Sequence, residues 1–165
     1  MDTKWTYTGD YNLIKKGVFK MGKSLTTAMK IQRPASEVFQ ALINPEQMSN
    51  YWFSSGSGRI EEGKTITWRY DEYNAEGIVN ILEVVDPAKI VFTWGDPEQP
   101  TTVTIKLEEQ EKDSTVIRVT ESGFGENPDL ERMLGQKEGW VYMLTCLKAY
   151  TENGVNSLRA SLVHS

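Results

Sequence analysis

One long helical segment near the C-terminal end constrains the fold of this 165-residue chain more than any other feature. Asn127-Pro128-Asp129 supplies a capping side chain, a proline and a carboxylate, which are residue types that begin helices. Asn153-Gly154 supplies the types that end them in a left-handed turn. Because no proline intervenes, the pattern predicts one helix over residues 128–153, about 26 residues and roughly 39 Å long.

The apolar residues of this segment recur at intervals of three and four, which is the spacing of one helical face. From Trp140 to Tyr150 almost every residue is apolar or small, so we expect that half to be covered on more than one side. A helix this long and this apolar needs a large sheet to lie across. The predicted face consists of Leu130, Met133, Leu134, Trp140, Val141, Leu144 and Leu147.

The region before this helix predicts a strand, two short helices and a run of further strands. Apolar and polar residues alternate at 25–31, and Pro34 ends that strand. Residues 36–43 predict a short helix, and Asn44-Pro45 begins a second one in which Gln47 completes a capping box. Beyond a loop at 54–58, strands separated by turns are predicted at 65–70, 78–85, 90–94, 103–107 and 116–121.

Strands that follow one another without intervening helices form an antiparallel meander, so we predict an α+β fold with the long helix lying in a curved sheet. Residues 24–154 form the predicted domain, with a disordered or loosely packed N-terminal tail at 1–23 and a C-terminal tail at 155–165. Residues 15–18 can be encoded by a purine-rich run resembling a ribosome-binding site. A biological start at Met21 is therefore a hypothesis.

Composition narrows the possible functions. The length is that of one domain, and 39% hydrophobic and 25% charged residues are globular values. No apolar run or signal-peptide pattern predicts a membrane span or secretion. Cys146 stands alone, which excludes a disulfide framework and a cysteine metal cluster and favours a cytoplasmic location. The net charge of −5 disfavours nucleic acid and anionic membrane surfaces as partners.

A set of short motifs, taken in order, resembles one protein family. The motifs are Trp52-Phe53, Glu76-Gly77, Asp86-Pro87, Val91-Phe92-Thr93-Trp94, Val103-Thr104, Thr120-Glu121-Ser122-Gly123-Phe124 and Gly139-Trp140. Their order resembles the family of the activator of heat-shock protein 90 ATPase homologues, within the START-like, Bet v allergen-like superfamily. The resemblance covers about residues 25–154. It implies a helix-grip fold, in which the sheet wraps the C-terminal helix around an elongated apolar cavity. Members of the superfamily bind lipids, sterols, polyketides and other hydrophobic molecules there.

Large aromatic residues are the main candidates for the wall of such a cavity. Trp52, Trp68 and Trp94 lie on faces predicted to point inward, as does Trp140 on the long helix; each can equally be a core residue. Gly139 weakens the helix, and either close packing against the sheet or a ligand passing over it would explain its presence. The candidate ligand-binding residues are Trp52, Phe53, Trp68, Phe92, Trp94, Val103, Ile105, Glu121, Met133, Lys137 and Trp140.

Glu121 is the polar residue of most interest. It continues the alternating face of Ile117 and Val119, so strand geometry points it inward. A carboxylate there must be paired, hydrogen-bonded or protonated, and Arg69, Arg118 or Lys137 could be its partner. Glu121 is either a local structural group at the end of the sheet or the polar anchor of the pocket.

Catalysis finds little support in the residue pattern. His164 is the single histidine, no phosphate loop, nucleophile elbow or zinc spacing occurs, and Cys146 reads as a core thiol. We therefore expect a non-enzyme without cofactor or metal that binds a small hydrophobic molecule. The alternative is a co-chaperone-like protein that acts through its surface on a heat-shock protein 90 type ATPase. A cyclase-like or hydrolase-like enzyme that uses Glu121 is a third hypothesis.

Overall fold

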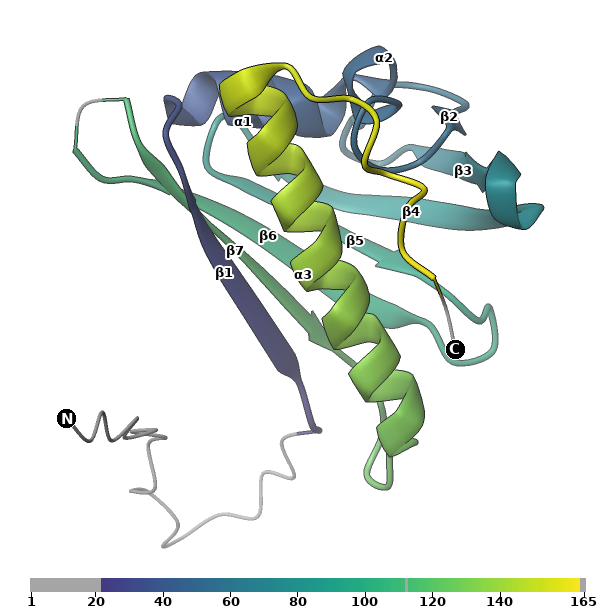
Figure 1. Ribbon diagram of the computed structural model, residues 1–165. Coiled ribbons are helices and arrows are strands. Elements are labelled where there is room, and N and C mark those ends of the chain that lie inside the picture. The colour runs from purple at the N-terminus through teal and green to yellow at the C-terminus, as the bar shows by residue number, and fades with distance from the viewer. Residues whose placement is uncertain (1–21, 112, 164–165) are drawn as a thin grey trace, which may run out of the picture.

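The computed structural model describes residues 22–111 and 113–163 (Figure 1). Most of the segment predicted as an N-terminal tail, together with Met21 and His164, lies outside these ranges. Within them, seven strands form one antiparallel sheet in the order β1-β7-β6-β5-β4-β3-β2. The strands are β1 (Leu25–Ile31), β2 (Ser55–Gly56), β3 (Thr65–Tyr70), β4 (Ala75–Val85), β5 (Lys89–Trp94), β6 (Thr101–Glu109) and β7 (Thr115–Ser122).

Two short helices and one long helix complete the fold. The helix α1 (Ala35–Ile43) and the helix α2 (Pro45–Met48) follow β1, and a single turn of 3-10 helix, η1 (Asp71–Tyr73), joins β3 to β4. The long helix α3 (Leu130–Asn153) crosses one face of the curved sheet (Figure 1). The predicted α+β helix-grip architecture is therefore confirmed.

The meander follows from simple alternation along each strand. In β6 the residues at every second position from Thr101 to Leu107 are buried, and in β7 the same holds from Thr115 to Glu121. Register aligns these faces, because Val103 lies opposite Glu121 and Ile105 lies opposite Val119. Since side chains alternate between faces, one inward set from each strand builds the surface on which α3 rests.

The strand β2 was not expected, because the sequence pattern predicts a loop there. Its two residues pair with Arg69 and Trp68 of β3. A Ser/Gly pair carries no hydrophobic alternation, so only the presence of the β3 edge makes it a strand.

Helix α3 buries only part of the predicted face. Its buried residues are Trp140, Met143, Leu144, Cys146 and Leu147. Leu130 and Leu134 are 68% and 61% exposed, and Val141 is also exposed. These three residues form a second apolar stripe. At ~100° per residue it lies roughly a quarter-turn around the helix axis from Trp140. Spacing alone merges the two stripes, because it cannot show which one faces the sheet.

The ends of α3 are set by specific caps. The side chain of Asp129 accepts a hydrogen bond from the Glu131 N–H at 3.0 Å, so Asp129 is the N-cap. The predicted start at Pro128 is wrong by two residues, since the acceptor nearest the first free N–H groups is Asp129. Gly154 ends the helix with φ +68°, as predicted. Arg33 also donates to the carbonyls of Thr151 and Glu152 in the last turn.

Two glycines of α3 should respond to alanine in opposite directions. Gly154→Ala should lower the free energy of unfolding by about 1 kcal/mol, because a Cβ disfavours the left-handed backbone. Gly139→Ala should raise it by up to about 1 kcal/mol, because alanine is the better helix former. Urea unfolding of the two variants provides the measurement. Effects of the same sign would contradict this account of the helix.

Candidate functional site

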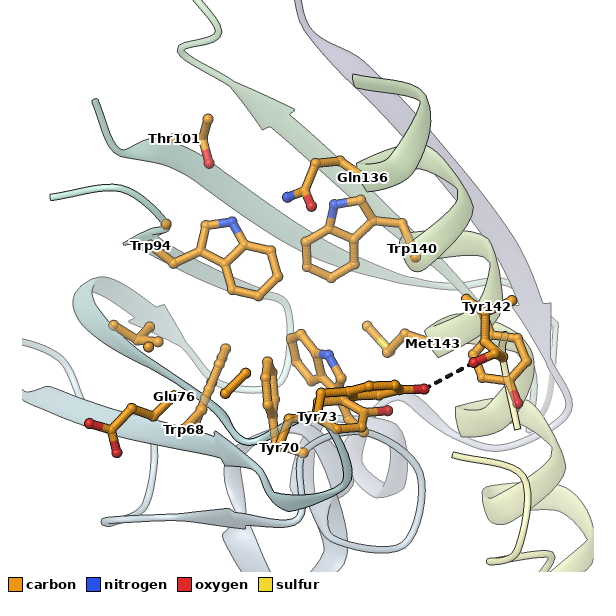
Figure 2. Close-up of a pocket in the computed structure, with 18 of the residues that line it drawn as sticks. Trp68, Tyr70, Tyr73, Glu76, Trp94, Thr101, Gln136, Trp140, Tyr142 and Met143 are labelled. Atoms are coloured by element: carbon orange, nitrogen blue, oxygen red, sulfur yellow. Dashed lines mark hydrogen bonds between the residues drawn. The ribbon is translucent and has the colours of Figure 1, made fainter. Parts of the chain in front are cut away.

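A cavity of about 620 Å³ lies between α3 and the sheet. This volume falls within the ~300–1,000 Å³ range of small-molecule sites. Its lining comes from the segment after α2, from β3, η1 and β4, from the end of β5 and from one face of α3 (Figure 2). The cavity is therefore a product of the tertiary fold and no single element contains it.

Four tryptophans belong to the aromatic wall, together with Phe53 and four tyrosines. The ring centroids of Trp52 lie 4.8 Å from Trp68 and 5.6 Å from Trp140, and Trp94 lies 5.2 Å from Trp140. These centroid distances and tilted or edge-on angles are the favourable geometry for aromatic pairs, which contribute about 0.5–1.5 kcal/mol each beyond their buried area. The wall is thus a connected cluster rather than a set of independent side chains.

Glu121 lies behind this wall and is 0% exposed. Its Oε1 accepts hydrogen bonds from Trp94 Nε1 at 3.0 Å and from Thr101 Oγ1 at 2.6 Å. Its Oε2 accepts from Trp140 Nε1 at 2.7 Å. The amide nitrogen of Gln136 donates to both oxygens, at 3.0 and 3.2 Å. Figure 2 shows the indole nitrogens of Trp94 and Trp140 turned toward Thr101 and Gln136, two polar residues that also belong to the lining.

The four donors satisfy both oxygens of a buried acid without a cationic partner. This is the set of contacts that an acceptor-only, ionised carboxylate requires. Of the three partners expected for Glu121, Arg69 forms an ion pair with Glu76 at 3.0 Å, Lys137 donates to the Thr26 carbonyl, and Arg118 is exposed on β7. Glu121 therefore faces the back of the indole wall, and the carboxylate is not part of the cavity lining.

The structure separates the residues predicted from the sequence into two groups. Trp52, Phe53, Trp68, Trp94 and Trp140 line the cavity. Phe92, Val103 and Ile105 are buried in the core beneath it, because they sit on central strands of the sheet. Met133 packs against the core and Lys137 reaches β1, so these two helix residues also lie off the lining. Ligand contact remains a prediction for every member of the set.

Several lining residues were missed by sequence reasoning. Arg132, Gln136 and Met143 are on the same helical stripe as Trp140, at i−8, i−4 and i+3. Extending that stripe from Trp140 in both directions would have found them, but their mixed polarity hides it from an apolar pattern. For Gly139, no described atom outside its own helical turn lies within 4 Å of a built Cβ. Close packing therefore does not explain this glycine.

Comparison with known proteins identifies the family. The profile described as Activator of Hsp90 ATPase homolog 1-like protein matches residues 32–152. The chain belongs to this family. A comparison with curated proteins found no significant match.

Solved structures of other proteins share the fold of this family member. The protein SSP2350 from Staphylococcus saprophyticus is 46% identical, with a TM-score of 0.74 over 84% of this chain and 98% of that chain. The Aha1 dimer from Colwellia psychrerythraea is 21% identical, with a TM-score of 0.69 over 80% of this chain and 98% of the other. CalU16 from Micromonospora echinospora is 18% identical, with a TM-score of 0.65 over 87% of this chain and 90% of the other. At their low identities, the last two show the fold alone.

The segment 155–163, here called the C-terminal strap, runs back over one end of the cavity, where Leu162 joins the lining. Three tyrosine hydroxyls donate to its backbone carbonyls. Tyr70 donates to Arg159 O at 2.5 Å and Tyr73 donates to Leu162 O at 3.0 Å (Figure 2), while Tyr142 of α3 donates to Leu158 O. The sequence predicts a tail here, because side-chain to backbone contacts leave no periodic signal.

Arg159 holds the strap against η1 and the segment that follows α2. Its guanidinium donates to the Trp52 carbonyl at 3.0 Å, to Ser54 Oγ at 2.8 Å and to the carboxylate of Glu72, and it lies 5.0 Å from the Tyr70 ring centroid. Hydrogen bonding to Arg159 lowers the pKa of Glu72 from 4.5 to about 2. Burial raises the pKa of Tyr70 to about 12, so its hydroxyl remains a donor at neutral pH.

The described residues offer little support for metal binding or for thiol chemistry. Among residues 22–111 and 113–163, no group of three His, Cys, Asp or Glu side chains could hold a metal ion. Burial raises the pKa of the Cys146 thiol, which makes the reactive thiolate less accessible at neutral pH. No helix in the described part of the chain is both long and apolar enough to cross a membrane.

Glu121→Gln should destabilise the protein although the two side chains have the same shape. The new amide N–H₂ must face one of the donors that hold the carboxylate, which leaves buried donors unsatisfied. We expect a loss of about 1–3 kcal/mol in the free energy of unfolding, with a change in tryptophan emission. Glu108→Gln on the exposed side of β6 is the control and should change stability by less than about 0.5 kcal/mol. A Glu121→Gln protein as stable as this control would refute the role of the carboxylate.

The strap contact of Glu72 should depend on pH in a defined window. Because its folded pKa is depressed from 4.5 to about 2, its contribution is present above pH 4.5 and is lost as the pH falls toward 2. An NMR titration of the Glu72 carboxyl should show this depressed pKa, and Arg159→Gln should return it toward 4.5. Arg118→Gln on the exposed face of β7 should leave it unchanged. An ordinary Glu72 pKa in the parent protein would show that the ion pair does not hold the strap in solution.

Proposed function

We propose that this protein binds a small hydrophobic molecule in the cavity between α3 and the sheet. The observation that carries the proposal is the cavity of about 620 Å³ walled by aromatic rings from separate elements. Protein interiors are close-packed and leave few voids larger than a water molecule. An apolar space of this size therefore supports a role in binding.

Gly139 supports the same conclusion from the helix side. It lies between Gln136 and Met143 in the part of α3 that lines the cavity. A glycine in a helix interior costs up to about 1 kcal/mol relative to alanine. Since packing against a neighbour does not require it, the absent side chain leaves room over the helix for a ligand.

Glu121 serves this function as a positioning residue. It fixes the rings of Trp94 and Trp140 through their N–H groups, so the wall is already formed before a ligand arrives. Pre-organisation of this kind improves affinity, because fewer side chains are ordered on binding. Both of its oxygens are engaged by donors of the protein, and we therefore propose binding rather than acid–base catalysis.

The second candidate is contact with a heat-shock ATPase through the surface of α3. The exposed stripe of Leu130, Leu134 and Val141 favours it, because exposed apolar residues in a row mark interaction surfaces. The family description names activators of Hsp90 ATPase, which agrees with such a role. A Gly139→Leu variant distinguishes the two candidate functions. It places a side chain in the cavity and leaves the exposed stripe unchanged, so it should impair ligand binding and not contact with an ATPase.

Placing a larger side chain in the cavity from α3 should weaken binding of an apolar probe. N-phenyl-1-naphthylamine should bind the parent protein saturably, with a rise in its fluorescence. Gly139→Leu should weaken this binding at least about tenfold, because the leucine side chain occupies space that the ligand needs. Gly135→Leu is the matched control, since Gly135 is on the exposed side of the same helix with open space around it and is not a lining residue.

Thermal unfolding checks that both leucine variants are folded. Both should be at least as stable as the parent, because leucine is a better helix former than glycine. Absence of saturable probe binding to the parent protein would overturn the proposed function, and equal affinity in both variants would place the site elsewhere.

A further inference from the structure

Arg132 introduces a positive charge into the cavity lining. It lies in the first turn of α3 and lines the cavity together with Gly95 and Asp96, which follow β5. A Cβ built on Gly95 would be 3.8 Å from Arg132 Nη2, and the guanidinium lies 5.6 Å from the centroid of the Phe124 ring. The guanidinium therefore reaches from the helix across to the end of β5.

This guanidinium has no carboxylate within ion-pair distance among the described residues. The two acidic residues of the lining are engaged elsewhere. Glu76 pairs with Arg69 at 3.0 Å on the outside of the sheet, and Asp96 is exposed and accepts a hydrogen bond from the Glu98 N–H in its own turn. Arg132 is thus a charge at the cavity without a counter-charge in this part of the chain.

Most other hydrogen-bond donors around the cavity are committed, and the buried Nε1 of Trp68, which has no hydrogen-bond partner among the described residues, is an exception. Two indoles, Thr101 and Gln136 donate to Glu121. Three tyrosines donate to carbonyls of the strap. An acceptor on a ligand would therefore find its strongest open partner in Arg132, whose planar fork suits an anionic oxygen group.

The lining also changes polarity along α3. From Arg132 to Met143 it passes Gln136, Gly139 and Trp140, over about 16 Å at 1.5 Å per residue. Beyond Gln136 the lining is mainly aromatic and apolar, with Trp140 and Met143 on α3 and Trp52, Phe53 and Trp68 opposite the helix. A ligand that matches both ends has an apolar body and a single charged head.

We propose that the ligand is an amphipathic organic anion, bound with its apolar body among the tryptophans and its anionic head on Arg132. The inference rests on the proposed function and adds the chemical class of the ligand. It makes Arg132 a specificity-determining residue. Neutral apolar molecules enter the same space without using this contact.

Two probes with the same aromatic body test the proposal. 1-Anilinonaphthalene-8-sulfonate carries one anionic group, and N-phenyl-1-naphthylamine lacks it. Arg132→Gln should weaken binding of the sulfonate about tenfold, the size expected for loss of one charge-assisted contact, and should leave the neutral probe within about twofold. Displacement of the neutral probe by the anionic one places both in the same cavity.

Two further variants control for charge and folding. Arg118→Gln removes the same charge from the exposed face of β7 and should leave both affinities unchanged. Arg132→Lys keeps the charge and should retain most of the sulfonate affinity.

The outcomes distinguish the two proposals. An equal effect of Arg132→Gln on both probes, or none on the sulfonate, would overturn the amphipathic-anion proposal and leave cavity binding intact. Failure of the neutral probe to bind the parent protein would instead overturn the proposed function itself.

Discussion

The cavity depends on the hydrogen bonds that the buried carboxylate of Glu121 accepts. Glu121 lies on β7 and accepts hydrogen bonds from Trp94 of β5, Thr101 of β6 and two residues of α3. A buried carboxylate is costly unless its oxygens are satisfied. Both are satisfied only when the helix sits in one position across three strands, so the acid selects that position.

The aromatic wall follows from this arrangement. Because the N–H edges of Trp94 and Trp140 are held at Glu121, their ring carbons are turned to the space between helix and sheet (Figure 2). Gly139 keeps that space open from the helix side, and the strap covers its far end through Tyr70 and Tyr73. Because the carboxylate binds the polar N–H edges of the two indoles, their apolar carbon edges are left to line the cavity. The aromatic wall is therefore formed in the folded protein without a ligand.

The sequence was most informative where regular alternation or helical spacing is strong. It predicts the strands that form the meander and the inward direction of Glu121, because a strand residue shares the face of residues two positions away. It is less informative for α3, where two apolar stripes lie close together and Leu130 and Leu134 belong to the exposed one. It misses Arg132 as a lining residue, because a charged side chain does not extend an apolar pattern.

The sequence by itself determined the fold class, the order of elements and the presence of several inward aromatic residues, since local periodicity and turn chemistry encode these directly. Only the tertiary structure decided what those residues do. Glu121 holds two indoles in place and does not line the cavity surface. Its hydrogen-bond partners come from three other elements, β5, β6 and α3. The strap likewise depends on contacts between Arg159 and residues near 52–72. Such contacts join positions distant in the chain, and no local pattern records them.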